Sequence, residues 1–424
     1  MIHTKKELNR FIKDREKLGI KPGLKRVETL LRLAGNPELN IKAVHVAGTN
    51  GKGSVIQFMQ TALIKNGYRV GVFTSPSFNG IGGHYLINGI SAEETELIPL
   101  FNQLLPAIRE LDQNGDAPTS FEIITVIAFI YFHKMVDIAL IETGMGGRYD
   151  TTNCFKPILS IITNIAYDHT QFLGDSIAEI ASHKAGIIKP NIPVVTGILS
   201  KQAEEVIRKE AEEKKATLYQ QNVNFCLKNQ VYKSEVLNIH PTSLHVGLDG
   251  VHQLDNAAVA FTSLQLMKQQ LHFTLNLDFI LKAFTHTFLP GRFEQIHANP
   301  NIILDSAHNP AGVESFIKTI EQTDKAPNKQ LLFAGFKDKQ LDQMMFLLKD
   351  YFDVLTVTTF AHERAATIPV LTSLLKQSQV NIAYNWQETI DTFMRDTSGK
   401  KNYYITGSLH FITMVRAYIL EKYC

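Results

Sequence analysis

The sequence predicts an α/β fold with a mostly parallel sheet, because short apolar segments alternate along the chain with longer helical patterns. Each apolar segment is a run of about 4–8 residues, bounded by Gly, Pro or Asn, as in strands that are buried on both faces. Strands are predicted over 41–47, 68–74, 137–142, 158–165 and 192–197. Amphipathic helices are predicted between them over 54–66, 120–134 and 175–186.

Residues 215–250 differ, because apolar and polar residues alternate there as they do in small antiparallel strands. A helix is predicted to follow over about 254–270. The segment 286–301 then concentrates Pro, Gly and Asn and interrupts the helical patterns. We therefore predict a domain boundary in this segment, with a larger domain at 1–290 and a smaller one at 291–424.

The strand–helix alternation restarts beyond that boundary. Strand candidates separated by helical patterns are "NIILDSAHNP", "KQLLFAGF", "FDVLTVTTF" and "YYITGSLH". The smaller domain is therefore predicted to be α/β as well.

Composition excludes several classes of partner. A net charge of +2 gives no electrostatic footprint for nucleic acid or an anionic membrane, so we expect neither. No apolar run approaches the roughly 18 residues of a membrane span, and the charged N-terminus lacks the apolar core of a secretion signal. The three cysteines lie far apart, which excludes a cysteine-ligated zinc site and argues for a reducing compartment. We expect a cytoplasmic enzyme.

The segment "AVHVAGTNGKGSVIQF" (43–58) has the composition of a phosphate-binding loop but departs from the pattern G-x-x-x-x-G-K-[ST]. Val46 stands where the first glycine belongs, and Gly53 separates Lys52 from Ser54. Lys52 would neutralise phosphate oxygens, and the Ser54 hydroxyl could bind Mg²⁺. On spacing alone, a flexible glycine-rich turn with a solvated lysine remains an alternative.

Three further strands end in polar residues that suit a metal ion. Glu142 ends one strand and is followed by three nearby glycines, Asp168 and His169 follow another, and Ser75 follows a third. The carboxyl ends of parallel strands meet at the sheet edge where ligands bind in open α/β folds. Ser54, Ser75, Glu142 and His169 are therefore predicted to converge there and to bind Mg²⁺.

Two other segments carry candidate residues with weaker local signals. Lys184 in "HKAGIIK" lies on a predicted helix, and its local sequence favours a solvated or salt-bridged lysine. Asp305 and His308 in "ILDSAHNPAG" form a polar rim at a strand end. A hydrolase triad is rejected for them because the chain has no G-x-S-x-G elbow.

Ten motifs occur in an order that resembles one known family. They are "HVAGTNGKGSV", "FTSP", "FEIITVIAF", "IETGMGGRYDTTN", "DHTQFLG", "HKAGIIK", "GVHQLDNAAVA", "PGRFE", "DSAHNPAG" and "ITGSL". Together they resemble the folylpolyglutamate synthase and dihydrofolate synthase family of the Mur ligase superfamily, over nearly the whole chain. The G-x-x-G-K-G-S form of the loop is the version that this superfamily uses.

The resemblance implies a Mur-ligase-like fold, in which a P-loop ATPase-type N-terminal domain precedes a smaller Rossmann-like C-terminal domain. It implies ATP and Mg²⁺ as cofactors, with Ser75, Glu142 and His169 as Mg²⁺ ligands beside Ser54. The implied phosphate-binding residues are Thr49, Asn50, Gly51, Lys52, Gly53 and Ser54.

The same resemblance assigns roles to five more positions. Asn256 would contact adenine, Arg292 and Asp305 would contact ATP, and His308 would assist near the nucleotide. Lys184 matches a lysine that is carbamylated in this superfamily, which would turn a cation into an anion that supports a second Mg²⁺. The residues expected to take part in catalysis are Lys52, Glu142, His169, Lys184 and Arg292.

The implied reaction is the ATP-dependent addition of L-glutamate to the γ-carboxylate of a folyl-(poly)glutamate through an acyl phosphate. The substrates would be folate or pteroate, L-glutamate and ATP, and we expect a monomer. A dihydrofolate synthase that uses dihydropteroate, alone or in a bifunctional enzyme, remains an alternative. A non-catalytic ATP-binding paralogue is another. A peptidoglycan-type Mur ligase is disfavoured because no UDP-binding domain precedes residue 41.

The chain departs from the family in "SPSFNGIGGHYLINGIS". Ser77 follows the proline, and Gly83, His84 and Tyr85 replace the family's Glu-Arg-Ile. We expect the altered 77–85 loop to be more mobile and less charged, with consequences for pterin or polyglutamate specificity rather than for ATP. This departure is what motivates the paralogue alternative.

Overall fold

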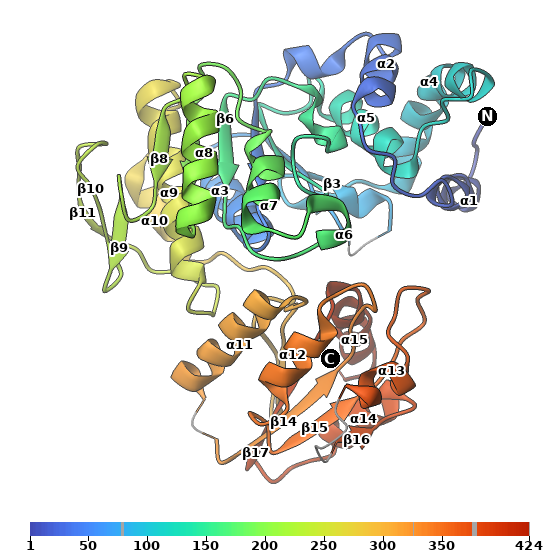
Figure 1. Cartoon of the computed structure of the whole chain (residues 1–424), viewed down its shortest axis with the longest axis vertical. Coiled ribbons are helices and arrows are strands. Elements are labelled where there is room, and N and C mark those ends of the chain that lie inside the picture. The colour runs from blue at the N-terminus through green and yellow to red at the C-terminus, as the bar shows by residue number, and fades with distance from the viewer. Residues whose placement is uncertain (78–79, 325, 375–379, 424) are drawn as a thin grey trace. The chain divides into compact units, whose positions relative to one another are not determined.

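The chain forms two compact units in the computed structural model, which describes residues 1–77, 80–324, 326–374 and 380–423 (Figure 1). The N-terminal unit comprises Met1–Ile165, Leu173–His245 and Asp255–Thr287. The C-terminal unit comprises Ala166–Phe172, Val246–Leu254 and Phe288–Cys424. Two short segments that precede the predicted boundary thus group with the C-terminal unit, and the division at 290 stays a prediction.

An eight-stranded sheet in the order β4-β3-β2-β5-β1-β6-β7-β8 forms the centre of the N-terminal unit. Its parallel strands are β1 (Ala43–Ala47), β2 (Val70–Phe73), β5 (Ile138–Glu142), β6 (Leu159–Ile162), β7 (Val194–Thr196) and β8 (Leu218–Gln220). The first five confirm the predicted strands. The antiparallel strands β3 (Tyr85–Ile87) and β4 (Ile90–Ser91), which the sequence patterns did not reveal, extend the β2 edge.

Helices surround this sheet, as the strand–helix alternation predicts. They are α1 (Lys5–Glu16), α2 (Lys25–Leu33), α3 (Lys52–Lys65), α4 (Glu94–Gln113), α5 (Ser120–Phe132), α7 (Ile177–Ala185), α8 (Lys201–Glu213), α9 (Gln253–Gln270) and α10 (Leu277–Thr285), with the 3₁₀ helices η1 (Pro37–Asn40), η2 (Gly82–His84) and η3 (Thr151–Cys154). The short helix α6 (Thr170–Leu173) lies mostly in the segment Ala166–Phe172, which groups with the C-terminal unit. The helix α5 is apolar on all sides because α1, α2 and α4 pack around it. Figure 1 shows α7 and α8 side by side, and their apolar residues join β6 and β7 in one core.

The alternating segment near 215–250 forms a small antiparallel sheet of β9 (Cys226–Lys228), β10 (Val231–Ser234) and β11 (Ile239–Ser243), as predicted. Its anchor is the fully buried Tyr232, whose hydroxyl lies 2.9 Å from the Thr262 hydroxyl in α9. The sheet is therefore packed against the helix that was predicted to follow it.

The C-terminal unit has a six-stranded sheet in the order β12-β13-β17-β14-β15-β16. Only β12 (Glu294–Ala298) is antiparallel, and the other strands are β13 (Asn301–Leu304), β14 (Asn328–Phe333), β15 (Val354–Val357), β16 (Asn381–Ile382) and β17 (Lys401–Thr406). The helices are α11 (Pro310–Thr323), α12 (Leu341–Leu348), α13 (Ile368–Ser373), α14 (Trp386–Met394) and α15 (Leu409–Tyr423). One core packs α11, α12 and α13 on one face of the sheet, and a second core packs α14 and α15 on the other. The four strand candidates of the smaller domain are confirmed as β13, β14, β15 and β17.

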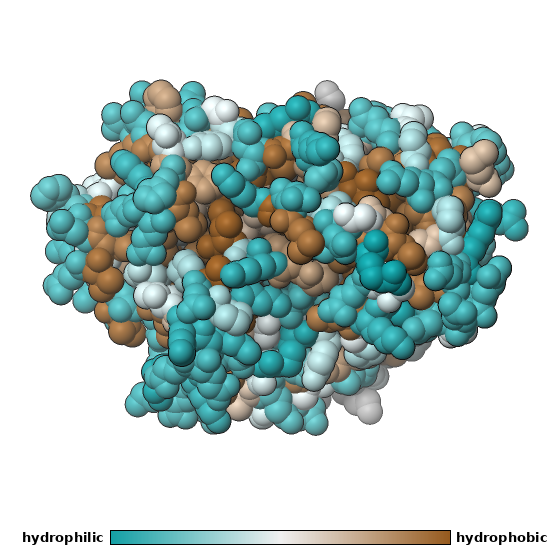
Figure 2. Space-filling model, turned by 90° about the horizontal axis from the view of Figure 1, so that it is seen from above, coloured by the Kyte–Doolittle hydropathy of each residue, from teal (hydrophilic) through white to brown (hydrophobic). Residues whose placement is uncertain are grey.

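The surface mixes hydrophilic and hydrophobic residues. In Figure 2, brown hydrophobic residues form patches separated by teal hydrophilic ones on the face seen from above. Within the part of the chain that the structure describes, no helix has the length and apolar character needed to cross a membrane.

Candidate active site

The phosphate-binding loop connects the end of β1 to the start of α3, which begins at Lys52, two residues earlier than predicted. Gly51 precedes the helix with φ +83°, and a Cβ atom there would lie 2.4 Å from the Asn256 Oδ1 atom. A side chain at this position would therefore meet both backbone strain and a collision. The first turn of α3, with Lys52, Gly53 and Ser54, presents the backbone N–H groups of a helix N-terminus, which favour an anion.

Residues after β6 hold this loop in shape. The backbone N–H groups of Thr49 and Asn50 donate to the Asn164 backbone oxygen (3.0 Å) and to its side-chain Oδ1 atom (2.8 Å). The Thr163 hydroxyl donates to the Asn50 backbone oxygen at 2.5 Å. Since these two N–H groups serve the loop itself, the helix turn offers the backbone donors for a phosphate. The sequence patterns gave no signal for Asn164.

Glu142, the last residue of β5, is only 5% exposed. Its Oε2 atom accepts a hydrogen bond from the Thr74 hydroxyl, and its Oε1 atom lies 3.9 Å from the Lys52 Nζ atom. The neighbouring strands explain this geometry, because β5 lies between β1 and β2 and Val46 is paired with Glu142. The predicted convergence of strand ends therefore brings Lys52 to Glu142. The hydroxyl bonded to Glu142 belongs to Thr74, whereas Ser75 beside it was the expected ligand.

Lys52 extends back over the loop that precedes it. Its Nζ atom donates to the backbone oxygens of Gly48 (3.1 Å) and Thr49 (3.4 Å). The ammonium group thereby lies close to the loop and to the Glu142 carboxylate, in position to neutralise an anion bound at the helix terminus.

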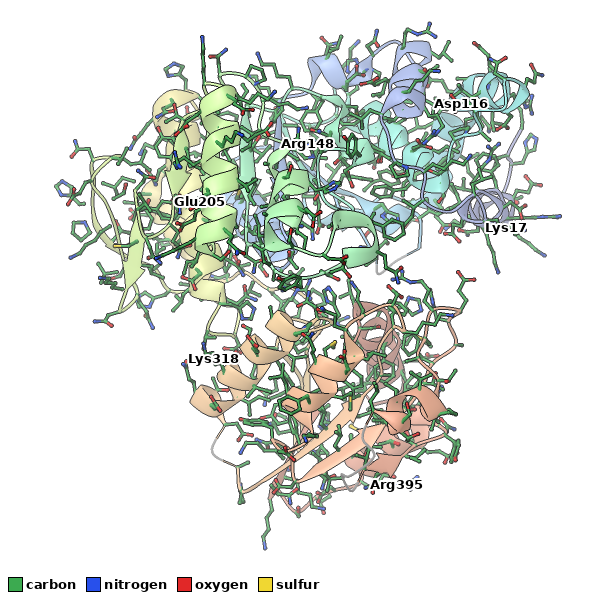
Figure 3. All side chains as sticks on the ribbon, viewed as in Figure 1. Lys17, Asp116, Arg148, Glu205, Lys318 and Arg395 are labelled. Atoms are coloured by element: carbon green, nitrogen blue, oxygen red, sulfur yellow. The ribbon has the colours of Figure 1, made fainter. Side chains whose placement is uncertain are left out.

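Lys184 is 3% exposed near the end of α7, which excludes the solvated lysine that its local sequence favoured. The loop after β5 packs against this end of the helix, since the Arg148 backbone N–H donates to the His183 oxygen at 2.6 Å. Arg148, which Figure 3 labels, also forms an ion pair with Glu210 at 2.7 Å. The loop 143–148 therefore begins directly after Glu142 and contacts α7 at His183, the residue before Lys184.

In the C-terminal unit, Asp168 is the centre of a polar cluster. Its Oδ1 atom lies 2.5 Å from the Lys339 Nζ atom, and its Oδ2 atom accepts from Asn309 (3.3 Å) and lies 3.7 Å from the His308 Nε2 atom. The Lys339 Nζ atom also lies 3.3 Å from the His169 Nε2 atom. Burial alone would raise the pKa of Asp168, but the His308 and Lys339 partners outweigh it and hold that pKa well below its usual range. Lys339 was not among the residues singled out from the sequence.

Asp305 follows β13, and its carboxylate binds backbone N–H groups of neighbouring segments. Its Oδ2 atom accepts from the Phe293 backbone N–H (2.9 Å) and its Oδ1 atom from that of Ala307 (2.8 Å). Burial raises the pKa of Asp305, while the charge of Arg292 opposes that shift. The carboxylate thus fixes the backbone beside Arg292, and His308 bonds the Ser306 oxygen through its Nδ1 atom at 2.8 Å.

The site suits a magnesium ion that is bound together with phosphates. Among the described residues, no group of three or more His, Cys, Asp and Glu side chains could hold a metal ion alone. Mg²⁺ commonly takes one or two carboxylates and completes its shell with phosphate oxygens and water. Glu142 and the Thr74 hydroxyl bonded to it fit that donor set, and Ser75 follows Thr74 in the sequence while Ser54 lies in the first turn of α3. Ser54, Ser75 and Glu142 belong to the N-terminal unit, and His169 groups with the C-terminal unit.

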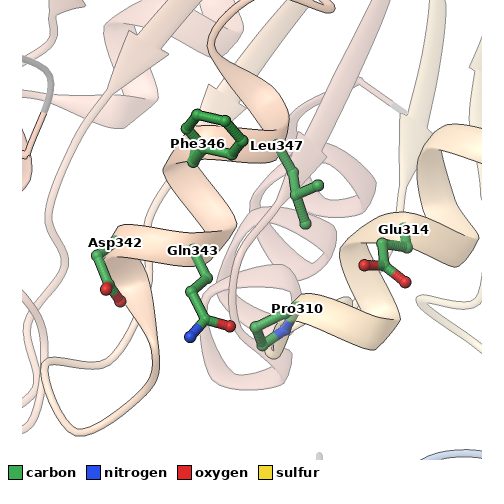
Figure 4. Close-up of a pocket in the computed structure, with 6 residues that line it drawn as sticks. All are labelled: Pro310, Glu314, Asp342, Gln343, Phe346 and Leu347. Carbon is green, nitrogen blue, oxygen red and sulfur yellow. The ribbon is translucent and has the colours of Figure 1, made fainter.

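A pocket of about 450 Å³ in the C-terminal unit lies outside this set of residues. Pro310 and Glu314 of α11 and Asp342, Gln343, Phe346 and Leu347 of α12 line it (Figure 4). Two carboxylates on its rim would repel a triphosphate, so we do not assign ATP to it.

Family models match both parts of the chain. The Mur ligase middle domain matches residues 46–264, and the Mur ligase glutamate ligase domain matches residues 291–409. Together with the phosphate loop beside a strand-end carboxylate, these matches define a ligase of the Mur type.

Similar proteins of known identity cover nearly the whole chain. The Bacillus subtilis dihydrofolate synthase/folylpolyglutamate synthase is 35% identical over 96% of this chain and 97% of its own length. A Mycobacterium tuberculosis folylpolyglutamate synthase complexed with ADP and AMPPCP has a TM-score of 0.87 at 26% identity, over 97% of each chain. Escherichia coli FolC in complex with DHPP and ADP has a TM-score of 0.88 at 25% identity, over 98% of each chain.

The chain belongs to the folylpolyglutamate synthase/dihydrofolate synthase family of the Mur ligase superfamily. It is an ATP-dependent ligase of that family, and both the predicted resemblance and the predicted fold class are confirmed.

Proposed function

We propose that the chain adds L-glutamate to the γ-carboxylate of a folyl-(poly)glutamate, with ATP as the energy source. The observation that carries this proposal is the cluster of Lys52, Thr74 and Glu142 at the phosphate loop. The similarity of the chain to the B. subtilis dihydrofolate synthase/folylpolyglutamate synthase supports an acceptor of the folate or pteroate class.

In the proposed site, the first turn of α3 holds the ATP phosphates and Lys52 neutralises their charge. Glu142, with Ser54 and a hydroxyl from Thr74 or Ser75, would hold Mg²⁺ on the triphosphate, and His169 would hold a further position. Bound Mg²⁺ would supply charge neutralisation at the phosphate oxygens. Asn256 lies against Gly51, so the side chain proposed to contact the nucleotide is close to the phosphate-binding loop.

The reaction would run in two steps. An oxygen of the acceptor carboxylate attacks the γ-phosphorus of ATP, forming an acyl phosphate and releasing ADP. The amine of L-glutamate then attacks the acyl carbon, loses a proton, and expels inorganic phosphate to leave an amide. Two anions must approach in the first step, so Lys52 and Arg292 would reduce their repulsion. Asp305 would act through the backbone beside Arg292.

Lys184 is proposed to act as a carbamate. Its burial makes a plain ammonium group costly, and addition of CO₂ to its amine would give an anion able to support a second Mg²⁺. Lys184→Arg retains a positive charge but cannot form the carbamate, so we expect it to lose activity that high bicarbonate does not restore.

The acceptor is tested with purified protein, ATP, Mg²⁺ and L-glutamate, supplied in parallel with tetrahydrofolate or with dihydropteroate. The measured quantities are ADP and the glutamylated product. Glutamylation of tetrahydrofolate supports the proposal, and product from dihydropteroate alone would replace it with a dihydrofolate synthase.

Dihydrofolate synthase activity is the second candidate. Two observations favour it: the B. subtilis relative carries both activities in its name, and E. coli FolC was solved with DHPP. Product from both acceptors would establish a bifunctional enzyme. ATP binding without ADP release for any acceptor would instead mark a non-catalytic paralogue. We expect the enzyme to act as a monomer in the cytoplasm on these small molecules.

A further inference from the structure

His84, the last residue of η2, lies in the 77–85 segment, where the sequence resemblance implies a departure from the family. Phe78 and Asn79 of the altered 77–85 loop lie outside the described residues. From Gly82 onward the segment is regular, as η2 runs directly into β3. Gly82 is packed so closely that a Cβ atom there would lie 2.1 Å from the Ala92 backbone oxygen.

Two hydrogen bonds connect His84 to Thr74. The Thr74 backbone N–H donates to the His84 oxygen at 3.2 Å, and the His84 Nδ1 atom lies 2.7 Å from the Thr74 oxygen. Because a carbonyl oxygen only accepts, the Nδ1 atom must carry the proton. The imidazole packs beside the rings of Phe73 (centroids 6.2 Å apart) and Tyr85 (6.3 Å), which also contact each other. His84 therefore holds the backbone of Thr74 through its own backbone oxygen and through its Nδ1–H group.

Thr74 transmits this constraint to Glu142. Its side chain is β-branched, so its χ1 angle is restricted once the backbone is fixed. Its hydroxyl donates to the Glu142 Oε2 atom, while the Lys52 Nζ atom lies 3.9 Å from Oε1. The carboxylate is thus held on one oxygen by Thr74 and faces the phosphate-loop lysine with the other.

We propose that His84 is a positioning residue for the nucleotide site, which acts through Thr74 to orient the Glu142 carboxylate toward Mg²⁺ on the triphosphate. This inference rests on the proposed function, since it uses the assignment of Glu142 as a metal ligand. It also changes the expected role of the altered segment. The replacement of Glu-Arg-Ile by Gly-His-Tyr, which the sequence resemblance implies, would then act on the ATP end of the site, not only on acceptor specificity.

The test compares two substitutions of His84. An asparagine amide nitrogen reaches about the same place as the Nδ1 atom and can donate to the Thr74 oxygen, whereas leucine fills the space without a donor. Groups that orient a metal ligand change metal affinity about 10- to 100-fold when they are removed. We expect His84→Leu to weaken Mg²⁺ binding to the AMPPCP complex by that factor, and His84→Asn to restore it to within about threefold. Calorimetric titration of Mg²⁺ into protein and AMPPCP measures this without turnover.

A double substitution tests the route through Thr74. Thr74→Val removes the hydroxyl and keeps the branched shape. If His84 acts only through Thr74, the double variant loses no more Mg²⁺ affinity than Thr74→Val does. Additive losses would overturn the inference.

The matched control is His297→Leu in the C-terminal unit, where the same kind of bond joins an imidazole Nδ1 atom to the Pro300 oxygen at 2.9 Å. We expect wild-type Mg²⁺ affinity for it. Should His84→Leu fail to unfold cooperatively, Thr74→Val alone carries the test, and wild-type affinity in that variant overturns the inference.

Failure of the inference differs from failure of the proposed function. Wild-type Mg²⁺ affinity in His84→Leu overturns the positioning role and leaves the ligase proposal standing. No Mg²⁺-dependent AMPPCP binding by the wild-type chain would overturn both. A steady-state assay adds a second readout, since a positioning role predicts a higher KM for Mg·ATP with an unchanged KM for the acceptor.

Discussion

Lys52 is a residue of the phosphate-binding loop from which we expect a large effect on turnover. Its ammonium group lies over the loop and 3.9 Å from Glu142, with 17% of the side chain exposed. Lys52→Ala should reduce kcat by about 10²- to 10³-fold, because it would remove the charge that we propose to stabilise the transferring phosphoryl group. The rate of ADP release in the presence of acceptor and L-glutamate measures the loss.

Lys65→Ala is the control for this change, because Lys65 is an exposed residue in the last turn of the same helix. It should retain the wild-type kcat. Activity within tenfold of wild type in Lys52→Ala would contradict the role given to Lys52. Loss of cooperative unfolding in that variant would mark the lysine as structural instead.

Some contacts of individual side chains could be predicted from the sequence and others could not. Strand ends that share a sheet edge were predictable, and Lys52 and Glu142 do meet there. The choice between Thr74 and Ser75 was not, because it depends on the backbone path after β2, which His84 fixes from ten residues away. Asn164 holds the loop through backbone groups of Thr49 and Asn50, a contact that leaves no pattern in the sequence.

The turn that starts α3 depends on Gly51 for both its backbone and its neighbours. Gly51→Ala should weaken AMPPCP binding at least tenfold, because a left-handed alanine costs about 1–2 kcal/mol and its Cβ would collide with Asn256. Either the loop or Asn256 must then move, and both are proposed nucleotide contacts. Calorimetric titration of AMPPCP in the presence of Mg²⁺ measures the change.

Gly67→Ala separates the effect of backbone strain from the effect of the collision with Asn256. Gly67 has nearly the same backbone angle, φ +88°, and a Cβ atom there would meet nothing within 4 Å. It should lose stability from strain alone and bind AMPPCP like the wild type. Equal losses of affinity in the two variants would contradict the argument for Gly51.

Hydrogen bonds to Asp391 of α14 join the last two helices of the C-terminal unit, α14 and α15. Lys422 (2.8 Å), Tyr423 (2.6 Å) and Tyr418 (2.7 Å) of α15 all donate to it, and these bonds lower the pKa of Asp391 to about 2. An unfolded aspartate titrates near about 3.9, so this stabilisation is complete above that pH and is lost as the pH falls toward 2.

Asp391→Asn should therefore lower the free energy of unfolding at pH 7 by about 1 kcal/mol, a modest value because solvent screens a group near the surface. The difference should shrink as the pH falls from about 4 through 2. Urea unfolding followed by the fluorescence of Trp386 measures it, since that residue is the only tryptophan and starts α14. The exposed Asp350→Asn is the control, and an equal effect there would contradict the network.

Helices and strands differ in how easily they can be predicted from their sequence patterns. The central strands were predictable because every residue of β1 and β5 is buried, which favours a mostly apolar run; the buried polar exceptions are His45 in β1 and Glu142 at the end of β5. The helix α4 contains Pro99 and Pro106, and interior prolines normally indicate a helix end. The hairpin of β3 and β4 is only a few residues long, too short for its alternation to stand out.

The assignment of segments to the two units was beyond the sequence patterns. His169 was predicted at the same sheet edge as Glu142, since both follow parallel strands. In the structure, Asp168 and His169 group with Lys339, which lies 170 residues further along the chain from His169. Such a pairing depends on how distant loops meet, and neither periodicity nor local motifs carry that information.

For the whole molecule, nucleotide binding should appear as a gain in thermal stability. A ligand that binds only the folded chain at about 100 times its Kd adds roughly 2.7 kcal/mol. For a unit of this size, that corresponds to an increase in Tm of about 5–10 °C. Scanning calorimetry with AMPPCP and Mg²⁺ should show the increase in the wild type, a smaller one without Mg²⁺, and none in Lys52→Ala. An equal increase in Lys52→Ala would place the nucleotide elsewhere, because removal of the phosphate-loop lysine must weaken an anion bound at the start of α3.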